Sequence, residues 1–272
     1  MKTVKYFLLV LILQFCFSKT SNSQNDGGCF NTKLLGPTKV FPVKPLPIVD
    51  ERDVMWHRRL WREIDLKEKI NQLLYFPNEK EDRKCCMYDL LYHKLMKGHI
   101  KAYDAKDDDF SKELTIKELS SMTGDSVLDI NGKLVYKELD SRDVVKYWVK
   151  EDWFYNSKYS KIEVRITGIC PVKVKVDRDG NILGYQQLFW LYYPNLRATL
   201  NNVEAFKKKK EGDPRVSFDD VFINRLFNGY IIQKEGGIKQ QVKQHKTELD
   251  IKLENEKTKQ YSFKKETGLW GN

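Results

Sequence analysis

The stretch of sequence that decides the fold is residues 161–193, which read KIEVRITGICPVKVKVDRDGNILGYQQLFWLYY. Apolar and polar side chains alternate in residues 162–167 and again in residues 172–177, with the period of two that is typical of half-buried strands. The Asp179-Gly180 dipeptide predicts a turn, and residues 182–193 become apolar on both faces toward their end. We therefore predict an antiparallel sheet in which the last of these strands is central.

A second β signal lies upstream of this block. Val127 to Ile130 and Lys133 to Tyr136 have the composition of short strands, and Asn131-Gly132 joins them. Asn-Gly accepts the positive φ angles that a type I′ turn requires. These residues therefore predict a β-hairpin.

Helical spacing precedes the β block. Residues 51–63 carry apolar side chains at roughly helical intervals, with arginines and a glutamate between them. Residues 85–97 show a similar pattern, and Gly98 follows them as a stop signal. We predict a helix over each of these two segments.

Helical patterns also follow the β block. Ser217 with Asp220 predicts a helix that starts with a capping-box-like motif, and Asn228-Gly229 predicts its end. Residues 238–259 predict a charged helix with a thin apolar stripe, which would pack on the body or on a partner. The expected fold is therefore α+β, with N-terminal helices, a central antiparallel sheet and C-terminal helices.

The N-terminus has the pattern of a secretory signal peptide. Lys2 and Lys5 precede an apolar run from Tyr6 to Phe17, which is too short to span a bilayer as a helix. Small residues before Gln24 suit cleavage there, so residues 1–23 are the predicted signal peptide. Residues 24–49, rich in Pro and Gly, predict an extended arm, and residues 50–272 the α+β domain. We expect an exported protein without a transmembrane span.

Export affects how the cysteines and the charge are interpreted. Cys29, Cys85, Cys86 and Cys170 would lie in a compartment where disulfides persist. Either Cys85 or Cys86 pairs with Cys170 or Cys29, or all four are buried thiols; the sequence leaves both readings open. The formal net charge of +10 suits an anionic partner, and export argues against nucleic acid as that partner.

The sequence shows no signature of catalysis, metal binding or cofactor binding. The ligands Cys85, Cys86, His93 and His99 lack the cysteine spacing of structural zinc sites. There is no nucleophile elbow and no phosphate-binding loop. Glu151 and Asp152 lie beside aromatic residues as in a glycosidase, but adjacent residues on a strand point to opposite faces. We therefore predict a protein that is not an enzyme.

Several separated motifs resemble one known family. In order they are MWHRRLWREID at residues 55–65, KEKIN at 67–71, KEDWF at 150–154, FWLYYP at 189–194 and FDDVF at 218–222. Together they resemble the gliding motility protein family GldN, also called PorN, from about residue 50 to Trp270. The paralogous GldO proteins share these motifs, so the choice between GldN and GldO stays open.

The resemblance implies a structural role rather than a catalytic one. Proteins of this family are periplasmic components of the type IX secretion system and lie at the inner face of the outer membrane. The resemblance implies a ring complex formed with a GldK/PorK-type lipoprotein, with self-association inside the ring. It also implies contact with a GldM/PorM-type inner-membrane protein. A periplasmic glycan-acting enzyme and a periplasmic chaperone are the alternatives.

Three tryptophans are the expected partner contacts. On a helix, Trp56 and Trp61 would lie about 140° apart, so one would face the core and the other a partner. Trp270, near the charged C-terminal helix, is the third candidate.

Overall fold

The computed structural model describes residues 42–77, 85–106, 109–128, 134–177, 181–205 and 215–234. Several expectations concern residues outside these ranges and stay predictions: the signal peptide, Cys29, residues 24–41 of the arm, the Asn131-Gly132 and Asp179-Gly180 turns, the helix at residues 238–259, and Trp270.

An antiparallel sheet is the centre of the described structure. Its strand order is β2-β8-β6-β5-β1-β9, and β7 pairs with β6 beside β8. The strands are β1 (Val54–Asp65), β2 (Tyr103–Asp104), β5 (Val144–Asn156), β6 (Lys161–Val176), β7 (Ile182–Gln187), β8 (Phe189–Tyr192) and β9 (Tyr230–Lys234). A separate hairpin consists of β3 (Gly124–Leu128) and β4 (Leu134–Glu138), which confirms the predicted strand pair.

The helices are short. They are α2 (Gln72–Tyr75), α3 (Met87–Met96), α4 (Ile116–Met122), α5 (Tyr193–Asn202) and α6 (Phe218–Ile223), with 3-10 turns η3 (Glu51–Asp53), η4 (Lys69–Asn71) and η5 (Ser141–Asp143). α3 confirms the helix predicted over residues 85–97. Within the described ranges, no helix has the length and apolar character needed to cross a bilayer.

The helix predicted over residues 51–63 is wrong, because this segment forms β1. β1 pairs with β5 from Trp56 to Asp65 and with β9 through residues 60–63, so its C-terminal half lies inside the sheet. There both faces are covered, and Trp61 and Ile64 are buried on opposite faces. A strand buried on both sides loses its alternation, and its apolar residues then mimic helical spacing.

Three other boundaries differ from the sequence expectation. The two strands predicted within residues 161–177 are one long strand, β6, and the strand predicted over residues 182–193 is divided into β7 and β8. α6 has the predicted capping box but ends at Ile223, well before Asn228-Gly229. The predicted α+β class is consistent with the structure. The predicted first helix is replaced by strand β1, which belongs to the sheet.

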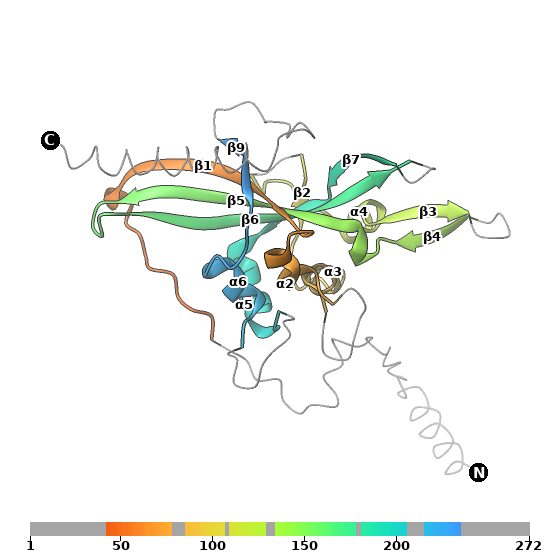
Figure 1. The fold of residues 1–272 in the computed structure, drawn as a ribbon, viewed down its shortest axis with the longest axis horizontal. Helices are drawn as coiled ribbons and strands as arrows, with labels where there is room; N and C mark the ends of the chain where they lie inside the picture. The colour runs from red at the N-terminus through yellow and green to blue at the C-terminus, as the bar shows by residue number, and fades with distance from the viewer. Residues whose placement is uncertain are drawn as a thin grey trace, which may run out of the picture.

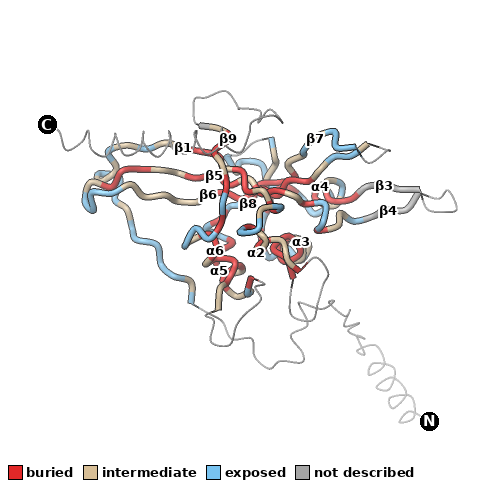
Figure 2. Tube along the Cα trace, in the orientation of Figure 1, coloured by how far each residue is buried: buried red, intermediate tan, exposed pale blue. Residues whose placement is uncertain are grey.

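Helices α2, α3, α5 and α6 cover one face of the sheet, here called the helix face (Figure 1). The main hydrophobic cluster joins them to inward residues of the sheet such as Tyr147, Val149 and Ile169. A smaller cluster of Trp61, Cys170, Trp190 and Ile232 lies on the opposite face, here called the outer face. Buried residues concentrate where the strands cross the helices, and the strand ends are more exposed (Figure 2).

Gly229 provides a test of this packing. A Cβ atom at Gly229 would lie 2.5 Å from the backbone oxygen of Glu63 on β1, so backbone must move to admit it. We expect Gly229→Ala to lower the free energy of unfolding by about 1–3 kcal/mol, measured by urea denaturation. Gly98→Asn is the control, because Asn tolerates the positive φ there and a Cβ meets nothing within 4 Å. Equal losses in the two variants would contradict this account.

Candidate functional site

Residues 42–50, here called the strap, are the described end of the predicted arm. They form no helix or strand and run from the α5 and α6 region to the start of β1 (Figure 1). Most of the strap is exposed (Figure 2), and Ile48 is 96% exposed. A segment this exposed needs specific attachments to hold its course.

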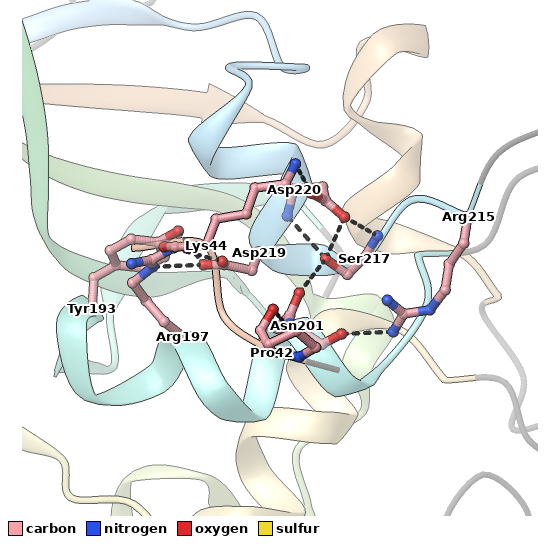
Figure 3. Close-up of polar contacts among 9 residues, drawn as sticks. All are labelled: Pro42, Lys44, Tyr193, Arg197, Asn201, Arg215, Ser217, Asp219 and Asp220. Carbon is pink, nitrogen blue, oxygen red and sulfur yellow. Dashed lines mark hydrogen bonds and ion pairs between the residues drawn. The ribbon is translucent and has the colours of Figure 1, made fainter. Parts of the chain in front are cut away.

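The first attachment, here called the anchor, lies on α5 and α6 (Figure 3). Arg197 Nη2 donates to the backbone oxygen of Lys44 at 2.7 Å, and Asn201 Nδ2 donates to that of Pro42 at 3.2 Å. The ammonium of Lys44 pairs with Asp220 at 3.0 Å. Two of the three contacts are therefore made to main-chain carbonyls, which any extended peptide presents.

Buried partners hold Arg197 in place. Asp219 accepts from Nε and Nη2 of Arg197 at 3.2 and 3.1 Å, and from the Tyr193 hydroxyl at 2.7 Å. The three residues are 8%, 3% and 1% exposed in the order Arg197, Asp219, Tyr193. Burial, together with the hydrogen bond to Asp219, raises the pKa of Tyr193, which therefore stays a neutral donor. The guanidinium is thus oriented by the fold itself, leaving Nη2 able to reach the strap.

The start of α6 forms the other half of the anchor. Ser217 and Asp220 make the predicted capping box, with the Ser217 hydroxyl 2.7 Å from Asp220 Oδ2. Burial would raise the pKa of Asp220, but hydrogen bonds from Ser217 and from Lys44 outweigh it and lower that pKa. The Ser217 hydroxyl also lies 3.4 Å from Asn201 Oδ1. This contact leaves the amide nitrogen of Asn201 directed at the strap.

A second, weaker attachment lies at the sheet. Arg165 on β6 donates to the backbone oxygen of Pro47 at 2.8 Å and pairs with Glu163 at 3.0 Å. Among the described residues, the bond from Arg165 to Pro47 is the one hydrogen bond made to positions 45–49. The strap is therefore held at separate points rather than along its length.

On the helix face of the sheet, the buried carboxylate of Glu151 joins several segments of the chain through hydrogen bonds and ion pairs. Glu151 on β5 is fully buried, and its oxygens accept from Arg62 at 3.1 Å, Arg225 at 2.7 Å and Trp153 at 2.9 Å. Burial raises the pKa of Glu151, but the two arginines more than offset it, so the pKa lies below its ordinary value. This carboxylate is held ionised by structural partners.

The outer face carries its own charged groups. Glu63 on β1 accepts from Lys146 at 2.6 Å, from the Trp148 indole at 2.9 Å and from the Tyr230 hydroxyl. Burial and the neighbouring Glu63 raise the pKa of Tyr230. β1, β5 and β9 are thereby joined through side chains as well as through their backbones.

Asp152 lies next to Glu151 but belongs to the outer face. It pairs with Arg59 at 2.8 Å and with His57 at 3.5 Å. The two neighbouring carboxylates therefore point to opposite faces, as the sequence predicted. They do not form the facing pair that glycoside hydrolysis requires.

The described cysteines lie in the core. Cys85, Cys86 and Cys170 are buried and form no disulfide with one another, which contradicts the pairing of Cys170 with Cys85 or Cys86. Cys86 caps α3, and burial raises the pKa of its thiol to about 12. Over the described ranges, no group of three or more His, Cys, Asp or Glu side chains is arranged to hold a metal ion.

Comparison with known proteins gives the family. The model of the family described as gliding motility associated protein GldN matches residues 49–271. The chain belongs to the GldN family. Membership associates it with gliding motility and the type IX secretion system, in which GldN is a structural component rather than a known enzyme. No curated protein is similar enough to the chain to count as a match.

Only part of the anchor of this GldN-family chain is predictable from the sequence. The capping box of Ser217 and Asp220 is predictable because its spacing is local. Arg197 and Asn201 are four residues apart on α5, which places them on one helix face, but nothing local shows that this face binds the strap. The strap itself was visible only as a segment rich in Pro and Gly.

The two described tryptophans of the expected interface have different surroundings. Trp56 and Trp61 both belong to β1, so their odd spacing places them on opposite faces rather than 140° apart on a helix. Trp56 is half-buried, whereas Trp61 is 8% exposed and packs with Cys170 and Trp190. The GldN-family match includes Trp270, which lies outside the described ranges.

Glu151 and Asp152 provide a matched pair of substitutions. Glu151→Gln leaves two arginines beside a neutral group in a buried site, so we expect a loss of about 3–5 kcal/mol in the free energy of unfolding. Asp152→Asn affects a pair that water reaches, and we expect a loss of about 1 kcal/mol or less. Urea denaturation of both variants measures the difference. A cost for Asp152→Asn as large as that for Glu151→Gln would contradict the assignment.

The lowered pKa of Glu151 predicts a dependence on pH. A carboxylate whose pKa is lowered by folding stabilises the folded state above its ordinary pKa of 4.5, and this contribution disappears as the pH falls through the folded pKa. We expect the stability gap between the parent chain and Glu151→Gln to be constant near neutral pH and to shrink below about pH 4.5. Thermal denaturation across pH 3–7 checks this. A stability difference between the two proteins that increases as the pH falls would contradict a lowered pKa for Glu151.

Proposed function

We propose that this protein is a periplasmic scaffolding subunit of the type IX secretion and gliding machinery. In this proposal it lies at the inner face of the outer membrane, in a ring formed with a GldK/PorK-type lipoprotein. It also contacts a GldM/PorM-type inner-membrane protein and associates with further copies of itself. The observation that carries the proposal is the GldN family match across residues 49–271.

The geometry of the described residues supports a structural role. Glu151, Glu63 and Asp152 each pair with cations of the same chain, so these carboxylates stabilise the sheet. The long strands β1, β5 and β6 extend past the helices and present a large surface (Figure 1). The predicted signal peptide supplies the route to the periplasm.

Trp56, Trp61 and Trp270 remain the proposed partner contacts. Of the two described, Trp56 has the surface access that an interface anchor needs, because its side chain is only half-buried. Trp61 would act indirectly, by shaping the outer face through its contacts with Trp190 and Cys170.

The test is recovery of the protein with its partners from mildly crosslinked, detergent-solubilised envelopes. We expect a tagged chain to bring down a lipoprotein and an inner-membrane protein in one large complex, identified by mass spectrometry and sized by gel filtration. A monomer that brings down neither partner would falsify the proposal. Activity on glycans or binding of many unfolded clients would then favour the alternatives.

Trp56→Ser tests the interface within that experiment. We expect it to reduce recovery of partners at least about tenfold, as for the loss of an interface hot spot, with the free energy of unfolding changed by less than about 1 kcal/mol. Met55→Ser is the matched control, because Met55 is the adjacent residue in the chain and its side chain is already 61% exposed. Equal recovery with the two variants would remove Trp56 from the interface.

A further inference from the structure

The anchor is built to recognise the main chain of an extended peptide. Its donors are Arg197 Nη2 and Asn201 Nδ2, and both residues are more than nine-tenths buried. Their acceptors are the backbone oxygens of Lys44 and Pro42, at 2.7 and 3.2 Å. Asp219 also accepts from Arg197, and Asn201 Oδ1 lies 3.4 Å from the Ser217 hydroxyl, so contacts outside the strap help to orient both donors.

The strap is suited to leave its own body. Between the anchor and β1 its residues are mostly exposed, and one hydrogen bond, from Arg165 to Pro47, joins positions 45–49 to the rest of the described chain. Pro42, Pro45 and Pro47 restrict φ and keep the segment extended whether or not it is docked. Undocking of the strap from the anchor therefore breaks few hydrogen bonds and ion pairs. Its docking loses little conformational entropy, because the prolines already restrict the segment.

These two properties make the anchor unable to distinguish its own strap from that of another copy. Each contact of the anchor would be reproduced identically by residues 42–44 of a second copy, and only the effective concentration differs. We propose that, in the assembled protein, the strap of each copy docks on the α5 and α6 anchor of its neighbour. This inference deepens the self-association in the proposed function and rests on it.

Such an exchange gives a head-to-tail contact, in which one copy donates its strap and receives another. Contacts of this kind close into rings when the rotation between copies closes. In a closed ring every anchor is filled, so exchange preserves all the contacts seen in Figure 3. The occupant of the anchor is therefore a second copy of this chain, bound through its main chain and the Lys44 ammonium.

Paired cysteine substitutions test the exchange in the full chain. Lys44 and Asp220 face each other across the anchor, with Nζ and Oδ1 3.0 Å apart, so cysteines at these two positions lie within reach of a short bismaleimide crosslinker. One tagged copy carries Lys44→Cys and a second, differently tagged copy carries Asp220→Cys, both with Cys29→Ser, co-expressed and treated with the crosslinker in the envelope. We expect a crosslink between the two tags at least about tenfold above the level with Lys44→Cys alone.

The double variant Lys44→Cys with Asp220→Cys in one copy separates the outcomes. Exchange predicts crosslinked multimers, whereas a strap that stays on its own body predicts an internal crosslink in a monomeric band. Internal crosslinking within a complex of full size would overturn strap exchange and leave the scaffold proposal intact. Absence of any large complex on gel filtration would overturn both.

Asn201→Asp shows whether the anchor itself holds the exchanged strap. It keeps the oxygen that lies beside the Ser217 hydroxyl but places a second oxygen against the backbone oxygen of Pro42. We expect the crosslink between copies to fall about tenfold. Asn202→Asp is the matched control, because Asn202 donates to the backbone oxygen of Ala198 on its own helix. Equal crosslinking in both variants would contradict recognition through Asn201.

Discussion

The buried carboxylate of Glu151 is the constraint on which the rest of the structure depends. Withdrawing a charged group from water costs several kcal/mol unless opposite charges and hydrogen bonds replace the lost water. Arg62 and Arg225 supply that replacement, from β1 and from the segment after α6. To reach Glu151, β1 must lie beside β5 and the chain must return across the sheet after α6. The arrangement of three distant segments thus follows from one side chain.

Charges on the two faces of the sheet also fix the register of β1. Glu63 must face outward to meet Lys146 and Trp148, while its neighbour Arg62 must face the helices to meet Glu151. A slip of one residue would exchange the two faces and leave both charged groups without their partners. The ion pairs of Glu63 and Glu151 therefore specify the register of β1 in addition to hydrophobic burial.

These same ion pairs explain where prediction from the sequence succeeded and where it failed. The alternation in residues 162–167 and 172–177 is local, so it predicts strands there, although not their continuity through Gly168 as the single strand β6. Residues 51–63 were misassigned because their arginines looked like the exposed side of a helix. Arg62 meets Glu151 across 89 positions of sequence, and no local pattern reveals that such a charge is buried.

The anchor shows the same limit at a functional level. Its capping box is local and was predicted, whereas Arg197 finds the backbone oxygen of Lys44 across 153 positions. The side chains that join α5 to α6 are also those that hold the strap. Docking of the strap is therefore supported by the packing of the core beneath it. Because Asp219 helps to orient Arg197 and prolines restrict the strap, the ordering cost that opposes docking of the strap is small.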